Sequence, residues 1–272
     1  MSRPSSKTRK RKSNRKGESA SKTKNVVGIS SLHIDKENTR VVVFTEDVLL
    51  NQLRRDGPKI EKSFDSLCEG ELAQLSSLVS RTASLLYSGL AIAKQNNDEI
   101  REACAMLLIN GSSSFAAAVA VLRMGYVLQP GIILRSLLEA LSTSLHLLQN
   151  PGDLAAYEKH KLPSTKTIAA AKRALPPFGQ LYGHFSENFV HIGRFHKTIN
   201  PVREYSKGNE ALELNLSSLR IAAWLLYVTT ELAFNELLQK PSYWQSVDQG
   251  YMYNPSEAEK EWMTEYFGLD LA

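Results

Sequence analysis

The sequence predicts an all-α protein, a helical bundle that follows a disordered basic N-terminus and a short N-terminal β-hairpin. Apolar residues recur at steps of three and four from position 60 to position 90, which is the period of an amphipathic helix. The most apolar long stretch, residues 221–238, contains Glu231, Asn235 and Glu236, so a buried helix is favoured over a membrane span. Because there is no internal repeat of solenoid period, a bundle is preferred over a solenoid.

Length and composition divide the chain into four expected parts. The 272 residues are 43% hydrophobic, which is enough to build a core. We expect a disordered basic tail at 1–24, a hairpin and short helix at 25–58, a helical bundle at 59–240, and a C-terminal segment with a capped helix at 241–272. The N-terminus lacks the apolar region of a secretory signal, and a cytoplasmic protein is expected.

The net charge of +5 is distributed unevenly. The first 24 residues hold ten Lys and Arg against the single Glu18, leaving 23 Lys and Arg against 27 Asp and Glu in the remainder. Attraction to nucleic acid is therefore expected mainly in the tail, by phosphate neutralisation and without sequence reading, because no aromatic residues interleave with the charges. The alternative is a solubilising arm without a specific partner. The proposed nucleic-acid-binding residues are Arg9, Lys10, Arg11, Lys12, Arg15 and Lys16.

The first expected elements are two β-branched segments, 25–34 and 39–44, flanking the polar turn 35–38. A short amphipathic helix follows at 45–55, opened by Thr45 and stopped by Gly57 and Pro58. The stripe from 60 to 90 then predicts one long helix, which ends at the Gln-Asn-Asn sequence 95–97.

The later elements are marked mostly by their ends. Asp98 can cap a helix, Pro130 can open the next one, and residues 150–152 can close it. Helices are also expected at 164–174 and 212–239. Ser256 and Glu259 form a capping box for a last helix that Gly268 can terminate. The two cysteines, in helical patterns without metal spacing, are expected to be buried and reduced.

One polar stripe stands out on the apolar helix at 132–148. Its members fall at steps of four, three, four and three, and they are Arg135, Glu139, Ser142, His146 and Gln149. Such spacing places them on one helix face. Two interpretations stay open: the stripe meets solvent as an ordinary amphipathic face, or it faces a polar cleft in which the Arg135–Glu139 pair orients a histidine or an anion.

A second polar segment is the aromatic and histidine-rich run 181–196. His184, Glu187 and His191 are spaced for one helix face and would suit zinc or iron, although no specific metal signature accompanies them. His191 with Arg194 could instead bind phosphate or act in proton transfer. No nucleophile elbow, phosphate-binding loop or dinucleotide fingerprint is present, so neither a cofactor nor a metal is expected.

Together these two segments carry a family resemblance. The helix GIILRSLLEALSTSLHLL, followed about forty residues later by LYGHFSENFVH, resembles uncharacterised bacterial helical proteins of the HEPN-like superfamily, over roughly residues 100–238. The resemblance implies a helical bundle that dimerises. It also implies a nucleic-acid-linked role, in bacterial stress response or phage defence, in which active members cleave RNA without metal through an Arg, four to six residues, and a His.

In this chain His191 matches the histidine of that motif, and Ser186 stands five residues before it where an Arg is required. Cleavage would need a base for the ribose 2′-hydroxyl, His191, and a fixed cation, either Arg135 held by Glu139 or Arg194. Whether the chain is an enzyme therefore stays open. The expected partners are RNA rather than DNA and a second copy of the chain, with no membrane. The competing hypothesis is a non-catalytic scaffold that its tail tethers to nucleic acid.

Overall fold

The computed structural model describes residues 28–37, 39–175, 177–192, 194–197, 201–248 and 250–267. The chain forms two compact units, Met1–Asn51 and Gln52–Ala272. The described part of the first unit is the hairpin of β1 (Ile29–Asp35) and β2 (Arg40–Thr45), followed by the single turn α1 (Val48–Asn51). Antiparallel register pairs Leu32 with Val43 and Ile34 with Val41. The predicted N-terminal hairpin is confirmed here, and the basic tail lies outside the described residues.

The second unit is an α-helical bundle, as the sequence predicts. A π-helical turn, Gln52–Asp56, leads into α2 (Gly57–Leu67), α3 (Glu69–Gln95), α4 (Glu99–Arg123), α5 (Gln129–Gln149), α6 (Leu154–Glu158), α7 (Ser164–Ala174), α8 (Pro177–Phe185), α9 (Glu210–Ala233) and α10 (Glu257–Phe267). A second hairpin, β3 (Trp244–Val247) and β4 (Gly250–Tyr253), separates α9 from α10. The sequence did not predict this hairpin.

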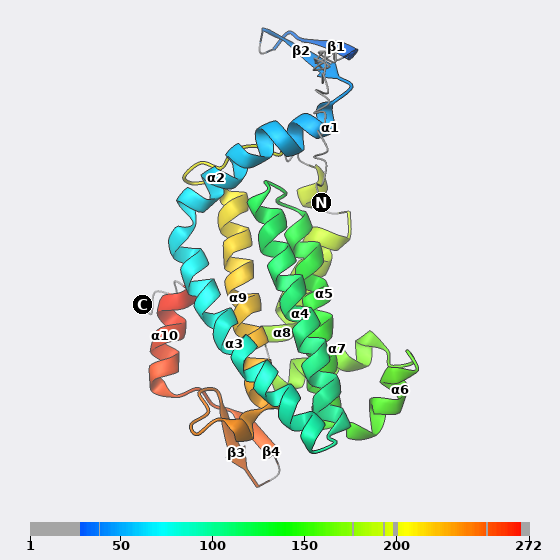
Figure 1. Cartoon of the computed structure of the whole chain (residues 1–272), viewed down its shortest axis with the longest axis vertical. Helices are drawn as coiled ribbons and strands as arrows, with labels where there is room; N and C mark the ends of the chain where they lie inside the picture. The colour runs from blue at the N-terminus through cyan, green and yellow to red at the C-terminus, as the bar shows by residue number, and fades with distance from the viewer. Residues whose placement is uncertain are drawn as a thin grey trace, which may run out of the picture. The chain divides into compact units, whose positions relative to one another are not determined.

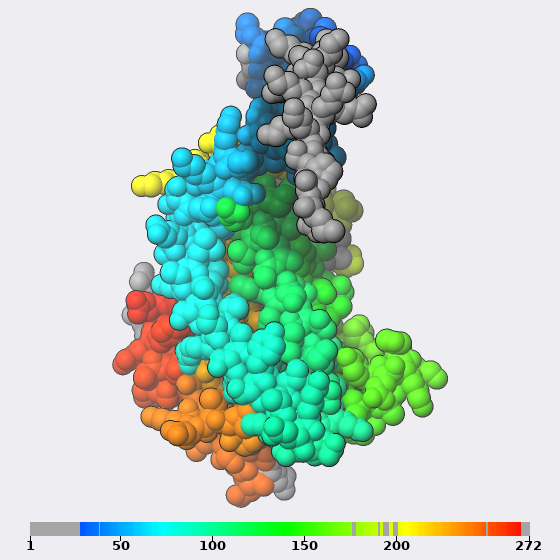
Figure 2. Space-filling view, in the orientation of Figure 1, coloured from blue at the N-terminus to red at the C-terminus, as the bar shows by residue number. Residues whose placement is uncertain are grey.

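Helix α9 is the central helix of this unit and packs against α3, α4 and α5 (Figure 1). Leucine, alanine and aromatic side chains are buried on nearly every face of its second half, so the core surrounds it. On the face seen in Figure 2, the atoms of α3 and α4 lie against one another. By length and composition α4, α5 and α9 could each cross a membrane, and 67% of the apolar window of α9 is buried inside the protein.

Two predicted helix boundaries are wrong. Gly57 and Pro58 begin α2 rather than stopping a helix, because the missing amide hydrogen of a proline costs nothing in a first turn. The stripe from 60 to 90 is interrupted at Cys68, whose non-helical backbone separates α2 from α3.

A third boundary is wrong at the end of α9, which stops at Ala233 instead of 239. There Phe234 leaves the helix and its ring packs directly over Gly89.

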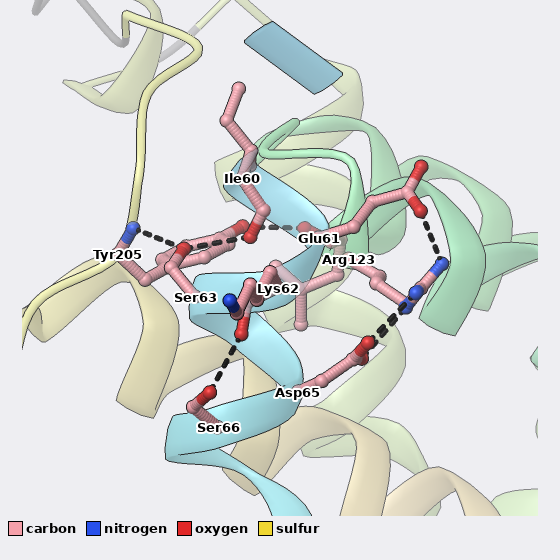
Figure 3. Close-up of polar contacts among 9 residues, drawn as sticks. Ile60, Glu61, Lys62, Ser63, Asp65, Ser66, Arg123 and Tyr205 are labelled. Carbon is pink, nitrogen blue, oxygen red and sulfur yellow. Dashed lines mark hydrogen bonds and ion pairs between the residues drawn. The ribbon is translucent and has the colours of Figure 1, made fainter. Parts of the chain in front are cut away.

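An arginine fork joins α2 to α4 (Figure 3). Arg123 donates from Nε and Nη2 to the two carboxylate oxygens of Asp65, both at 2.7 Å, and from Nη1 to Glu61 at 2.7 Å. On the other side of α2, the Ser63 hydroxyl accepts from the Tyr205 amide at 2.9 Å, and the Tyr205 hydroxyl donates to the Leu122 carbonyl at 2.5 Å. The last turn of α4 is thereby held from two directions.

Candidate functional site

Arg135 lies at the centre of a half-buried polar cluster on α5. Its Nη2 donates to the Tyr182 hydroxyl at 2.7 Å and lies 3.1 Å from Glu139 Oε1, while its Nε donates to Ser186 Oγ at 3.2 Å. The Tyr182 hydroxyl in turn donates to Glu139 at 3.3 Å. The side chains of Arg135 and Glu139 remain 31% and 37% exposed, so the pair is covered on one side and open to solvent on the other.

The covering residues come from α8 and the π-helical turn that continues it, Ser186–Val190. Tyr182 and Ser186 are four residues apart, which places both on the side that meets α5. Below them Phe189 lies over Gly131, where an added Cβ would approach the ring to 2.2 Å. Glycine in the first turn of α5 therefore allows this close approach, and the approach brings Ser186 to the guanidinium.

The next two members of the predicted stripe, Ser142 and His146, are buried and belong to two separate polar pairs. Ser142 shares a hydrogen bond of 3.1 Å with Thr167 of α7, and the His146 Nε2 lies 2.6 Å from Asp153. Hydrogen bonds from Lys166 and His146 hold the pKa of Asp153 below its usual value. Because Ser142 and His146 are buried and already paired, these contacts hold α5 against α7 and against the turn at Asp153 rather than offering a binding surface.

Gln149, the last member of the stripe, is in neither group: it lines a cleft beside β4. The stripe therefore matches neither sequence interpretation as a whole. Arg135 and Glu139 belong to a partly open polar cluster, Ser142 and His146 are buried, and Gln149 lines the cleft beside β4.

His191 follows the π-helical turn and is exposed. Its backbone amide donates to the Ser186 carbonyl at 2.9 Å, so the residue is anchored at the same serine whose hydroxyl accepts from Arg135. The structure thus brings Arg135 and the backbone of His191 to Ser186, while Glu139 contacts Arg135. The side chain of Arg194 and the tail residues from Arg9 to Lys16 lie outside the described part of the chain.

The metal alternative finds no support in the described residues, which contain no group of three His, Cys, Asp or Glu side chains that could hold a metal ion. His184 is turned away to other partners: its Nδ1 lies 3.1 Å from the Asn188 amide, and its ring packs edge-on against Phe185 and Phe189.

The cysteines are buried free thiols, as predicted. Burial raises the pKa of Cys68 to about 11 and that of Cys104 to about 12. Neither thiol is therefore a nucleophile near neutral pH.

Sequence reasoning missed Tyr182 and Ser186 as the partners of Arg135. Their spacing of four residues, in a run rich in aromatics, was the available signal. A scan of protein-family models and searches of curated proteins and of solved structures found no match to this chain.

Proposed function

We propose that this protein is a HEPN-like RNA-binding protein that cleaves RNA without a metal ion, using His191 and Arg135. One observation carries the proposal: Arg135 Nε lies 3.2 Å from the hydroxyl of Ser186, the residue five positions before His191. The resemblance requires an arginine at about this distance from the histidine along the chain. Here a guanidinium from α5 stands beside that position, so the missing charge is supplied from another helix.

Metal-independent RNA cleavage requires a general base and a fixed cation. A histidine takes the proton of the ribose 2′-hydroxyl as its oxygen attacks phosphorus, and the bond from phosphorus to the 5′-oxygen of the next nucleotide breaks as that oxygen takes a proton from water. A fixed cation stabilises the charge that gathers on the phosphoryl oxygens. His191 is exposed and free to reach a bound strand, and Arg135 is fixed in direction by Glu139, Tyr182 and Ser186.

The test is an incubation of the full-length protein with single-stranded RNA in the presence of a chelator. We expect cleavage products ending in a cyclic phosphate, loss of all cleavage in His191→Ala, and a rate at least about 100-fold lower in Arg135→Met. The control is His33→Ala, which removes an exposed histidine of the first unit. DNA of the same sequence lacks the 2′-hydroxyl and stays intact. Undiminished cleavage in His191→Ala would refute the assignment.

The basic tail is proposed to bring RNA to this site. Replacing Arg9, Lys10, Arg11, Lys12, Arg15 and Lys16 by serine removes six cations. Each phosphate contact to a single strand adds roughly 0.7 to the slope of log affinity against log salt, so the slope is expected to fall by about 4. A slope that stays the same in the serine variant would identify the tail as a solubilising arm.

A second candidate is a non-catalytic scaffold that binds RNA. It is favoured by the carboxylate of Glu139, 3.1 Å from Arg135, which neutralises much of the charge that catalysis would use. Under this alternative the wild-type protein binds RNA and leaves it uncut, and His191→Ala binds with equal affinity.

We also propose a homodimer formed through the first hairpin, in a cytoplasmic protein. One face of the hairpin consists of four aliphatic side chains that are half to two-thirds exposed: Leu32, Ile34, Val41 and Val43. A two-stranded hairpin is at best marginally stable by itself. Under two-fold symmetry the same apolar face of a second copy covers it, because such an interface is self-complementary.

A further inference from the structure

A cavity of about 650 Å³ lies between α3, α9 and the segment 237–242 that follows α9. Two cations line it, Arg81 and Lys240, and no acidic residue of the described chain does. Glu231, which accepts from the Ser242 amide, is fully buried and is not part of this lining. The apolar part of the lining consists of three leucines: Leu85, Leu237 and Leu238. The volume lies within the range of small-molecule sites, which is about 300–1,000 Å³.

Arg81 is held at this cavity without a carboxylate. Its Nη2 donates to the Tyr227 hydroxyl at 2.9 Å, and its guanidinium carbon lies 4.5 Å from the centroid of the Tyr227 ring. Tyr227 also lines the cavity and is only 5% exposed, so it gives the guanidinium a fixed support. Four other arginines of the bundle lie beside a carboxylate: Arg101, Arg123, Arg135 and Arg220. Arg81 has no such partner in the described part of the chain, so its charge is oriented and not neutralised.

A second cation and a row of hydroxyls line the same cavity. Lys240 is exposed and forms no ion pair with a described residue. Ser80, Ser84 and Ser88 recur at steps of four along α3 and are exposed, so their hydroxyls cover about 12 Å of one helix face. The Ser112 hydroxyl of α4 donates to the carbonyl four residues before it, whereas these three hydroxyls have no hydrogen bond to a described residue. Solvent-accessible donors and two positive charges therefore meet at one cavity.

This lining matches a phosphomonoester better than a carboxylate. A phosphomonoester carries a charge of about −1.5 to −2 near neutral pH and three strong acceptor oxygens. A carboxylate has a single charge and two oxygens. Arginine binds phosphate through its planar fork of donors and lysine binds it as a point charge, so the two cations of the cavity balance one phosphomonoester. The leucines offer an apolar wall to the organic group that the phosphate esterifies.

We propose that the cavity between α3, α9 and the segment 237–242 binds a small organic phosphomonoester, with its phosphate at Arg81 and Lys240 and its apolar body against the three leucines. The serine hydroxyls of α3 donate to the remaining phosphate oxygens. The proposal is independent of RNA cleavage, since neither Arg135 nor His191 lines the cavity.

The test is calorimetric titration of the full-length protein with phenyl phosphate, phenol and inorganic phosphate. We expect saturable one-to-one binding of phenyl phosphate. The affinities for the other two should be lower by about tenfold or more, because phenol lacks the charge and inorganic phosphate lacks the apolar body. Absence of phenyl phosphate binding would overturn the proposal, as would equal affinity for phenol. Equal affinity for inorganic phosphate would identify a site for the free ion and overturn the organic ester.

One pair of variants places a negative charge inside or outside the cavity. Ser84→Glu puts a carboxylate three residues from Arg81, where it pairs with the guanidinium and repels phosphate. The affinity for phenyl phosphate should fall by about tenfold or more. Ser113→Glu, at an exposed position of α4, adds the same charge and keeps the affinity. Wild-type affinity in Ser84→Glu, with an unchanged circular dichroism spectrum, contradicts the assignment.

A second pair removes one positive charge. Lys240→Met keeps an unbranched apolar side chain and should weaken phenyl phosphate by about tenfold while leaving phenol unchanged, a split that unfolding would not produce. Lys161→Met removes a cation at an exposed position between α6 and α7 and should bind phenyl phosphate as the wild type does. Equal losses in the two lysine variants would show that phosphate responds to net charge and not to this cavity.

Discussion

At the scale of single residues, the informative side chain is Arg135. It lies on a largely apolar helix, and its charge is tolerated because three oxygen-bearing side chains surround it while one side stays open to water. The ring of Tyr182 also lies 5.1 Å from the guanidinium carbon, close enough for a cation–π contact. The guanidinium is thus held in one direction, which suits cleavage, and its charge is partly neutralised by Glu139, which suits a scaffold.

The first residue-scale prediction concerns two glycines. Gly131→Ala would place a Cβ 2.2 Å from the Phe189 ring, so the ring and the turn that carries Ser186 must move. We expect a loss of about 1–3 kcal/mol in the free energy of unfolding. Gly183→Ala is the same chemical change inside α8, where a Cβ meets nothing within 4 Å. It should stabilise by up to about 1 kcal/mol.

Denaturant unfolding of both glycine variants checks this prediction. Equal effects of the two substitutions would show that the close approach of Phe189 to α5 is not a constraint. In the RNA assay, Gly131→Ala is expected to be impaired and Gly183→Ala to match the wild type.

At the scale of elements, the second hairpin depends on one carboxylate of α9. Glu231 is fully buried, and its Oε1 accepts from the backbone amides of Ser242, Tyr243 and Trp244 at 2.9, 2.6 and 3.2 Å. Burial raises its pKa in spite of these hydrogen bonds. Because three donors converge on one oxygen, the start of β3 is fixed to the bundle.

Removing this carboxylate should therefore lower the free energy of unfolding. Glu231→Ala leaves three amides, two of them on buried residues, without their acceptor, and we expect a loss of about 3 kcal/mol or more in the free energy of unfolding. Glu231→Gln keeps an acceptor oxygen and should lose less. The control is Glu213→Ala, at an exposed position of the same helix, which should change stability by no more than about 0.5 kcal/mol. Thermal or urea unfolding measures all three, and an Ala variant as stable as the control would contradict the role.

The arginine fork between α2 and α4 predicts a pH dependence. The hydrogen bonds from Arg123 hold the pKa of Asp65 below its ordinary value. The stabilisation is therefore complete above the unfolded-state pKa of about 4 and is lost as the pH falls through the lowered pKa of the folded state. Because both side chains are well exposed, it amounts to about 1 kcal/mol or less.

We expect Asp65→Asn to be less stable than the wild type at neutral pH and equal to it in strong acid. Urea unfolding across the acid range measures the difference. Glu261→Gln, at an exposed position of α10, controls for the loss of a carboxylate as such. A stability gap between Asp65→Asn and the wild type that persists unchanged in acid would rule out this origin.

The starts of three helices could be predicted from the sequence alone. Asp98 accepts from the Arg101 amide at 3.0 Å, Pro130 lies in the first turn of α5, and Ser256 accepts from the Glu259 amide at 3.3 Å, all as predicted. These are local signals, readable within four residues. The Glu259 carboxylate, expected to return to the cap, instead accepts from the Tyr243 hydroxyl at 2.8 Å.

What the sequence could not predict depends on contacts between distant segments. The end of α9 is set by Phe234 over Gly89, and the site is set by Tyr182 and Ser186 reaching across to Arg135. Each of these pairs is separated by dozens of residues, and helical periodicity carries no information about which polar side chain will meet which. The Arg135 stripe was therefore found from the sequence, and its division into separate networks was not.

At the scale of the whole molecule, the proposed dimer gives a prediction about assembly. Ile34→Lys would place a charge in the apolar face shared with the second copy, whereas Ser31→Lys places the same charge on the opposite face of the strand. We expect the first to raise the dimer dissociation constant by about 100-fold or more and the second to leave it unchanged. Light scattering across a dilution series measures both, and a wild-type monomer at every concentration would contradict the dimer.

The central position of α9 has a consequence for synthesis. A ribosome releases α3, α4 and α5 before the residues that complete their core, because α9 begins only at Glu210. During that interval α3, α4 and α5 can pack on one another, but the apolar surfaces that α9 covers in the folded protein stay exposed. The growing chain is therefore expected to rely on holding chaperones until its last quarter emerges, and truncations upstream of α9 should accumulate as aggregates.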